Sequence, residues 1–262
     1  MMTDINLHII GLGNLGQSFL NGFNNIDHGF NIYLYEENSQ VVNNLNTTYE
    51  IQESINEIDD GVVLLCIKPN DLNSFINLTK SKISSGVLIA SPIAGTTISH
   101  YENNFENKII RLMPNLSISN NSGFIPFAKN YEEDYLGFIS KLNLLGETHE
   151  YSEDLFDIIT AIFGSGPAWY FELSSKITDS AVNLGMKKED AKLIVQKLML
   201  SLPSLVGNND FDQVVNNIKS PNGTTEAGLN SLANDSFDKV IFNAIESAVN
   251  RSIEISKDTD DE

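Results

Sequence analysis

The feature that most constrains this chain is a glycine-rich turn near its start. Residues 11–16 follow the pattern G-x-G-x-x-G, and they are Gly11, Leu12, Gly13, Asn14, Leu15 and Gly16. The apolar segment Ile5–Ile10 before them reads as a strand, and Asn14–Asn24 carries apolar residues at helical spacing. Between a strand and a helix, this pattern is typical of a fold that binds a dinucleotide. The alternative is a glycine-rich turn without a ligand.

Each glycine of the motif has its own expected role. Gly11 would permit the tight turn, Gly13 would let a pyrophosphate approach the backbone, and Gly16 would let helix and strand pack closely. The free amides at the start of the helix would bind the phosphates. We therefore expect residues 11–16 to form the cofactor-binding turn.

Glu36 follows the second predicted strand, Phe30–Tyr35, and lies about 20 residues after Gly16. This is the spacing of the carboxylate that binds the hydroxyls of an adenosine ribose. The first Lys or Arg of the chain is Lys68, so no nearby cation in the sequence would pair with a 2′-phosphate. The expected cofactor is NAD(P)H, with NADH favoured. The alternative is a solvated charge at the end of a strand.

The strand and helix patterns divide the chain in two. Up to Tyr151, near-continuous apolar runs alternate with helices, which implies a parallel sheet covered on both faces. The predicted class is α/β, with an N-terminal Rossmann dinucleotide-binding domain over residues 1–151. Its further strands are expected at Gly61–Ile67, Gly86–Ala90 and Lys108–Met113, with edge strands at Phe124–Ala128 and Thr148–Tyr151.

Residues 152–257 are expected to form an all-helical dimerisation domain, followed by an acidic tail at 258–262. The predicted helices are Asp154–Ile162, Gly166–Leu184, Lys188–Val206, Phe211–Ile218 and Phe237–Ser256. Apolar residues in the second and third of these are dense on more than one face, so these helices need burial on several sides. Pairing with a second copy of the chain would provide that burial.

Composition excludes several classes of protein. Acidic residues outnumber basic ones by 35 to 16, and a formal charge of −19 would repel the phosphates of a nucleic acid. No apolar run approaches the roughly 18 residues that a membrane helix needs, so no membrane partner is expected. Met1–Asp4 lacks the basic start of a secretory signal, and Cys66 is the only cysteine. We expect a cytoplasmic protein without an internal disulfide.

Several other segments could meet a ligand. Lys68 and Pro69 end one predicted strand and Asn115 follows another, and ligands of open α/β sheets bind at the carboxyl ends of strands. The turns Gly164–Ala168 and Ser220–Thr225 precede helices, so their backbone amides could receive a carboxylate. The alternatives are a surface lysine after a strand and ordinary capped helix starts.

The chain offers no obvious proton donor for reducing a ketone. His8, His28, His100 and His149 share no motif and read as core or surface residues. Lys176 does not match the lysine spacing of hydroxyacid dehydrogenases. The sequence has no Ser/His/Asp arrangement, no HExxH and no CxxC, so no metal is expected.

Taken in order along nearly the whole chain, these pieces resemble pyrroline-5-carboxylate reductases. The resemblance rests on Gly11–Gly16, Lys68-Pro69, Ala94–Thr97, Arg111–Asn115, Gly164–Ala168 and Ser220–Thr225. It implies a Rossmann domain and a helical domain that interleaves with that of a second chain into a homodimer, with higher oligomers in some members. It also implies reduction of 1-pyrroline-5-carboxylate to L-proline by NAD(P)H, the last step of proline biosynthesis.

The resemblance also implies site residues. Thr225 matches the family threonine near the imine nitrogen and, with Ser220, is the expected catalytic residue. The substrate carboxylate would be held by the turn around Ser220, and the implied substrate-binding residues are Ser165, Gly166, Gly223, Thr224 and Thr225. A cyclic imine is more basic than a ketone and can arrive protonated. The absence of an evident general acid agrees with such a substrate.

The chain departs from the family pattern in a few places. Asn222 replaces the first of two glycines in the last turn, and Asn tolerates a positive φ. Leu116-Ser117 stand where the family often has Thr-Pro, and a His-Pro pair is absent near Asp210-Phe211. The alternatives are a reductase of another cyclic imino acid, such as piperideine-2-carboxylate, and a catalytically silent dinucleotide-binding dimer.

Overall fold

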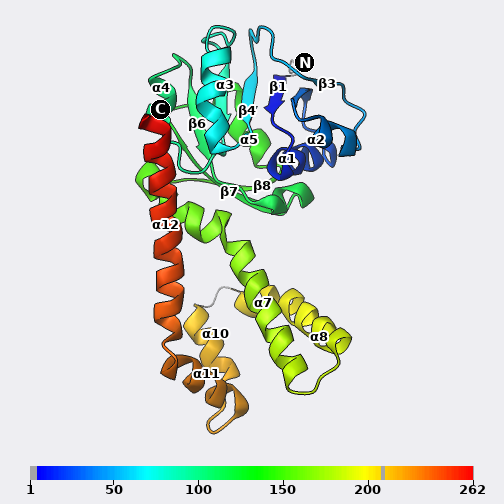
Figure 1. Ribbon diagram of the computed structural model, residues 1–262, viewed down its shortest axis with the longest axis vertical. Helices are drawn as coiled ribbons and strands as arrows, with labels where there is room; N and C mark the ends of the chain where they lie inside the picture. The colour runs from blue at the N-terminus through cyan, green and yellow to red at the C-terminus, as the bar shows by residue number, and fades with distance from the viewer. Residues whose placement is uncertain (1–4, 208–209, 262) are drawn as a thin grey trace. The chain divides into compact units, whose positions relative to one another are not determined.

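The computed structural model describes residues 5–207 and 210–261, with side chains as far as Lys257 (Figure 1). The side chains of the predicted tail 258–262, and Glu262 altogether, lie outside the described residues. The chain forms two compact units. The first is Met1–Gly164 with Ala248–Glu262, and the second is Ser165–Ser247.

One sheet organises the first unit. Its strands in chain order are β1 Ile5–Ile10, β2 Phe30–Tyr35, β3 Ile51–Gln52, β4 Val62–Leu65, β5 Leu88–Ser91, β6 Ile109–Leu112, β7 Gly123–Lys129 and β8 Gly146–Glu150. Their order in space is β3-β2-β1-β4-β5-β6-β7-β8. The chain runs outward from β1 to β2 and β3, then crosses to β4 on the other side of β1. The strand order reverses there, at the place where open α/β sheets bind their ligands.

The pairing corrects one expectation about the sheet edge. Phe124–Ala128 was expected at an edge, but β7 lies between β6 and β8 and pairs with both. Its residues Ile125–Ala128 are buried, which an inner strand requires. β8 lies at one edge of the sheet, as expected, and β3 lies at the other. All neighbouring pairs in the described sheet are parallel except β6 with β7, which is antiparallel.

Helices cover both faces of this sheet. They are α1 Asn14–Asn24, α2 Ser39–Asn44, α3 Leu72–Thr79, α4 Ile98–Glu102, α5 Phe138–Leu142 and α6 Phe156–Ile159. In the fully buried strand β4, Val62 and Leu64 join one hydrophobic cluster, whereas Val63 and Leu65 join the other. Since successive side chains of a strand point to opposite faces, both faces of the sheet carry a core.

Four short 3-10 turns and one π-helical turn connect these elements. The 3-10 turns are η1 Pro69–Asp71, η2 Leu116–Asn120, η3 Tyr135–Gly137 and η4 Glu153–Leu155, and the π-helical turn is η5 Thr160–Gly164. Three of them, η1, η2 and η4, follow strands β4, β6 and β8 along the chain. Of these, η1 and η2 lie in loops at the carboxyl ends of the parallel strands, where a ligand of this sheet would be sought, whereas β8 runs opposite to β4 and β6, so this argument does not extend to η4.

The second unit consists of helices and connecting turns in its described residues. Its helices are α7 Gly166–Asn183, α8 Lys188–Ser201, α9 Pro203–Val206, α10 Phe211–Ile218, α11 Thr224–Asn234 and the beginning of α12 Phe237–Asp261. Large apolar side chains are exposed on several of them, including Phe171 at 61%, Leu200 at 76% and Phe211 at 75%. These faces lack the burial that their sequence demands. No helix among the described residues combines the length and hydropathy needed to cross a bilayer.

The compact units do not coincide with the predicted ranges 1–151 and 152–257. Residues up to Gly164 stay with the sheet because Phe156 is fully buried in its second hydrophobic cluster. The last part of α12 also returns to the first unit, where the Ser252 hydroxyl donates to Asp157 Oδ1 at 2.6 Å.

Candidate functional site

The glycine turn between β1 and α1 has the geometry that a close ligand requires. Gly11 has φ +88°, and a Cβ there would lie 2.8 Å from the carbonyl oxygen of Cys66. A Cβ on Gly16 would lie 2.1 Å from the Gly11 oxygen. At Gly13, by contrast, a Cβ would meet no described atom within 4 Å. Two glycines therefore let the turn close on itself and on the end of β4, and the third leaves open space.

The start of α1 faces that open space without a capping side chain. Gly13 is the N-cap residue, and no side chain among the described residues bonds to the first-turn amides as a cap. Helix N-terminal amides need partners from outside the helix, and anions satisfy them well. The residues present therefore fit a dinucleotide pyrophosphate, which the amides of Asn14, Leu15 and Gly16 would hold.

Glu36 lies directly beside the glycine turn. Its Oε2 accepts a hydrogen bond from the Leu12 amide at 2.7 Å, and its Oε1 accepts one from the Asn38 amide at 2.9 Å. A carboxylate oxygen can accept more than one bond, so both oxygens keep capacity for the hydroxyls of a ribose. The structure thus brings together two features that the sequence separates, and it gives Glu36 a role in holding the turn that spacing alone did not reveal.

The other predicted cofactor residues lie at the ends of strands on the far side of β1. Lys68 is exposed and precedes η1, in which Pro69 is the first residue. Asn115 follows β6 and caps η2, because its Oδ1 accepts from the amide and the hydroxyl of Ser117. Lys68 is free to approach a ligand, whereas the side-chain oxygen of Asn115 already serves the fold.

A partly buried ion pair links β6, and the start of α4, to Glu153, which follows β8. Arg111, on β6, is only 3% exposed, and its Nη1 lies 3.1 Å from Glu153 Oε1. The same oxygen accepts the amide of Ile98, the first residue of α4, at 2.7 Å. The Arg111 guanidinium also lies 4.8 Å from the centre of the Phe156 ring. Sequence reasoning did not single out Glu153, whose partners are more than 40 residues away.

The turn Ser220–Thr225 opens α11 in the second unit. Asn222 has φ +58°, so it adopts the left-handed conformation expected of it in place of glycine. A Cβ on Gly223 would lie 2.3 Å from Ser220 Oγ and 3.0 Å from the Ser220 carbonyl oxygen, so a side chain there would displace the Ser220 hydroxyl. The Asn222 amide donates to Glu226 Oε2 at 2.8 Å, a contact that the sequence analysis missed although the acidic residue stands in the first turn of the helix.

The groups of this turn remain available to a ligand. Ser220 and Thr224 are exposed, and Thr225 is half-buried. Gly223 is the N-cap residue of α11, and no described side chain caps it. The turn therefore presents amides and hydroxyls together at a helix N-terminus, a suitable receptor for a carboxylate.

The turn before α7 has a similar form. The helix begins at Gly166 with Pro167 in its first turn, and Ser165 precedes it without a side-chain cap bond. Gly166 is buried and Ser165 is half-buried. Both residues belong to the second unit, as does the Ser220–Thr225 turn, whereas the glycine turn and Glu36 belong to the first.

Two titratable side chains near β1 are unsuited to proton transfer at neutral pH. Burial lowers the pKa of His8 to about 4, and its Nδ1 lies 3.0 Å from the Tyr35 hydroxyl. Burial also raises the pKa of the Cys66 thiol. The described site therefore contains neither an evident general acid nor a reactive thiolate.

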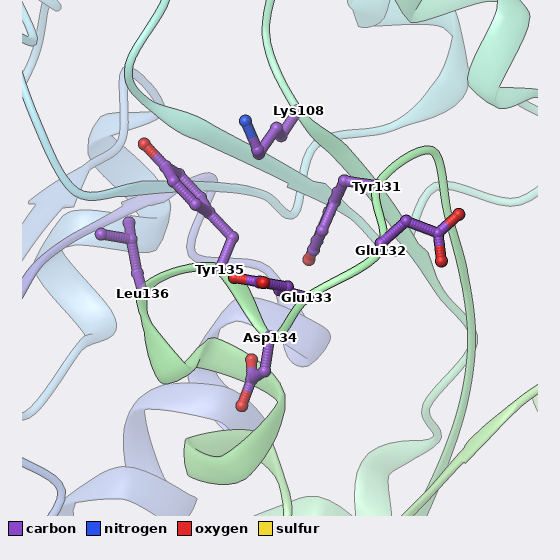
Figure 2. Close-up of a pocket in the computed structure, with 7 residues that line it drawn as sticks. All are labelled: Lys108, Tyr131, Glu132, Glu133, Asp134, Tyr135 and Leu136. Carbon is purple, nitrogen blue, oxygen red and sulfur yellow. The ribbon is translucent and has the colours of Figure 1, made fainter.

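A hollow of about 440 Å³ lies away from the carboxyl ends of the parallel strands (Figure 2). It is lined by Lys108, which precedes β6, and by Tyr131–Leu136, which follow β7. Lys108 Nζ lies 4.6 Å from the centre of the Tyr135 ring, and Asp134 accepts the amides of Ile139 and Ser140 at the start of α5. Lys108 and Asp134 therefore contact neighbouring parts of the fold, and none of the predicted site residues lines the hollow.

Comparison with known proteins decides the family. Residues 153–255 match the family model of the pyrroline-5-carboxylate reductase dimerisation domain, and residues 6–95 match that of coenzyme F420-dependent NADP oxidoreductases. Pyrroline-5-carboxylate reductase 1 of Bacillus subtilis is 31% identical over 95% of this chain and 89% of its own length. Its counterpart in Bacillus spizizenii is 32% identical with the same coverage. The chain belongs to the pyrroline-5-carboxylate reductase family.

Solved structures of pyrroline-5-carboxylate reductases share its fold. The Plasmodium falciparum pyrroline carboxylate reductase with NADP bound has a TM-score of 0.84 at 28% identity, covering 96% of this chain and 100% of the other. The reductase of Coxiella burnetii has a TM-score of 0.82 at 25% identity, covering 97% and 99%. The predicted Rossmann fold with a C-terminal helical region is confirmed for this member of the family.

Proposed function

We propose that the protein reduces 1-pyrroline-5-carboxylate to L-proline with NAD(P)H, the last step of proline biosynthesis. The observation that carries the proposal is the pair of uncapped helix starts, one at the glycine turn of the sheet unit and one at Ser220–Thr225 of the helical unit. The first suits a pyrophosphate and the second suits the carboxylate of a small substrate.

The residues act mainly by binding and alignment. A bound NAD(P)H supplies the hydride. The amides at the start of α1 hold its pyrophosphate and Glu36 holds the adenosine ribose, with Lys68 and Pro69 beside the cofactor. The turn at Ser220–Thr225 holds the substrate carboxylate, and Ser165 and Gly166 form a second wall of the pocket. Such alignment can lower a barrier by roughly 7–11 kcal/mol.

The reaction needs little help from a general acid in this site. The imine nitrogen can arrive protonated, and reduction at the neighbouring carbon leaves a neutral secondary amine. The Thr225 hydroxyl is assigned to the imine nitrogen, where it orients the ring, and Ser220 supports the carboxylate end. This division of roles explains how a site without a histidine or lysine general acid can work.

NADH is proposed as the preferred cofactor. Glu36 Oε2 lies 2.7 Å from the Leu12 amide, at the turn that would face the adenosine half. A 2′-phosphate would bring close to two negative charges toward this carboxylate. The related enzyme of Plasmodium falciparum was solved with NADP bound. The preference is therefore proposed for this sequence and not for its family.

The proposed assembly is a homodimer, open to further association, through the helices of the dimerisation domain. The support is the match of residues 153–255 to the dimerisation model and the exposed apolar side chains of α7, α8 and α10. We propose that the protein works in the cytoplasm, supported by its lone cysteine, and without a nucleic acid partner, supported by its charge of −19.

A substrate panel tests the proposed function. Oxidation of NADH is followed with pyrroline-5-carboxylate, with piperideine carboxylates and without substrate. The proposal predicts the highest kcat/KM with pyrroline-5-carboxylate. A higher value with a piperideine carboxylate would identify a reductase of another cyclic imino acid. Binding of NADH without turnover of any of these substrates would identify a silent dinucleotide-binding dimer.

A further inference from the structure

The end of α12 packs directly against a turn that follows β5. Gly95, in the Ala94–Thr97 segment, has φ +73°. A Cβ on it would lie 2.7 Å from Ile255 Cβ and Cγ2 and 2.8 Å from the Ser252 carbonyl oxygen. The helix and the turn are therefore in contact at backbone level, about 160 residues apart in the sequence. Figure 1 shows the red end of α12 beside α4, the helix that this turn begins.

A hydrogen bond from a buried serine fixes the helix at this point. Ser252 is 2% exposed, and its hydroxyl donates to Asp157 Oδ1 of α6 at 2.6 Å. A buried hydroxyl without a partner would be costly, so this bond determines how α12 is seated. The exposed residues on the same part of the helix, Arg251 and Glu254, pair with each other instead.

The same turn is held from its other end. The amide of Ile98, directly after the turn, donates to Glu153 Oε1, which also pairs with the buried Arg111. Thr96 is 1% exposed, and the Thr97 hydroxyl accepts the His100 amide at the start of α4. The ion pair of Glu153 therefore holds the end of the turn at Ile98, and α12 packs against the turn at Gly95.

The sheet order shows what this turn would contact. In the sheet, β1 lies between β2 and β4, and β5 lies beyond β4. Glu36 directly follows β2 along the chain. If a dinucleotide binds with its pyrophosphate at α1 and its adenosine toward Glu36, the nicotinamide half would lie toward the ends of β4 and β5. Ala94–Thr97 is the segment that leaves β5 at this edge.

We propose that Ser252 and Ile255 of α12, together with Asp157, are positioning residues for hydride transfer. They set the place of the Gly95 turn, and through it the place of the nicotinamide ring; this rests on the proposed function. Neither the affinity for the pyrophosphate nor the carboxylate-binding turn depends on this contact. Loosening α12 should therefore reduce the rate of reduction far more than the affinity for NADH.

The test compares Ser252→Ala and Asp157→Ala with two matched variants. Asp157→Asn keeps an oxygen that accepts the Ser252 hydroxyl, and Glu254→Ala removes an exposed side chain, 61% accessible, from the same stretch of helix. For each variant kcat, KM, the Kd of NADH, the emission spectrum of bound NADH and the melting temperature are measured on the full-length dimer.

We expect kcat to fall about 10-fold in Ser252→Ala and Asp157→Ala, with the Kd of NADH changed by less than about 2-fold. Asp157→Asn and Glu254→Ala should keep the wild-type values. Equal kcat in Ser252→Ala and Glu254→Ala would overturn the proposal, as would parallel losses of kcat, NADH affinity and melting temperature. If the wild type reduces no imine, the proposed function fails. The emission spectrum of bound NADH then decides the positioning role separately.

Discussion

At the scale of single residues, Glu36 carries the cofactor assignment. Replacing it with Ser removes the acceptor of the Leu12 amide and the charge that would face a 2′-phosphate. We expect weaker NADH use and a shift of the NADH to NADPH ratio of kcat/KM by roughly 10- to 150-fold, equivalent to about 1.5–3 kcal/mol. Steady-state kinetics with both cofactors measure the ratio.

The exposed neighbour Glu37 provides the control for this change. Glu37→Ser removes the same charge one residue further along and should leave the ratio near its wild-type value. A wild-type preference for NADPH, or a ratio that Glu36→Ser does not move, would refute the assignment of Glu36 to the ribose.

His8 gives the stability of the sheet unit a pH dependence. Burial lowers the pKa of His8 from 6.5 to about 4. Between these two pH values, His8 is therefore protonated in the unfolded chain and neutral in the folded chain. Stability from this residue is present above about pH 6.5 and is lost as the pH falls toward 4. With solvent screening of this partly buried group, the loss should amount to roughly 1–2 kcal/mol.

Denaturant unfolding of His8→Gln at several pH values checks this effect. The variant should show a smaller fall in the free energy of unfolding between neutral and acidic pH than the wild type. His149→Gln, at an exposed position, should retain the wild-type fall. Identical pH profiles for His8→Gln and wild type would remove His8 as a cause.

At the scale of elements, the start of α11 joins a backbone receptor to a hydroxyl. Thr225 lies in the first turn of this helix and is half-buried. Thr225→Ala should lower kcat by on the order of 10-fold while the Kd of NADH stays unchanged, because the residue belongs to the substrate side. Thr225→Ser, which keeps the hydroxyl, should restore most of the rate. Unchanged kcat in Thr225→Ala would leave the residue no role in the reaction.

Local elements were the most predictable part of the fold. β1, α1 and β2 begin and end at the predicted residues, because the glycine turn and a regular apolar pattern mark them. The strand predicted at Gly61–Ile67 is shorter in the structure, as Gly61 has φ +91° and the chain turns into η1 after Lys68. The strand β3 has only two residues, too few to show an alternating apolar pattern in the sequence.

Contacts between distant segments were not predictable. The antiparallel pairing of β7 with β6 follows from how the chain returns to the sheet, and no residue pattern within β7 encodes that direction. Glu153 and Ser252 carry no motif, and their partners lie 42 and 95 residues away in the sequence. The close packing of Gly16 against Gly11 was predictable because both residues belong to one short motif, whereas the contact of Gly11 with Cys66 joins the motif to a distant strand.

At the scale of the whole molecule, the helical unit should exist only as part of a dimer. Phe171 on α7 is 61% exposed, in a helix with large apolar side chains on several faces. Phe171→Asp should yield a monomer with greatly reduced activity, because a charge at an apolar interface is expensive to bury. Light scattering during size exclusion at micromolar concentration measures the change.

Leu78→Asp is the matched control, since Leu78 is 70% exposed on α3 of the sheet unit. It should remain dimeric and active. A wild-type protein that is a stable, active monomer at micromolar concentration would contradict the proposed assembly.

The central claim is transfer of a hydride from the dinucleotide to a cyclic imine to form proline. Its most direct test is to incubate the purified protein with pyrroline-5-carboxylate and NADH carrying deuterium at the transferred position of C4. Mass spectrometry of the product should then show L-proline with one deuterium on the former imine carbon. Proline without deuterium, or no proline despite bound NADH and substrate, would contradict the account.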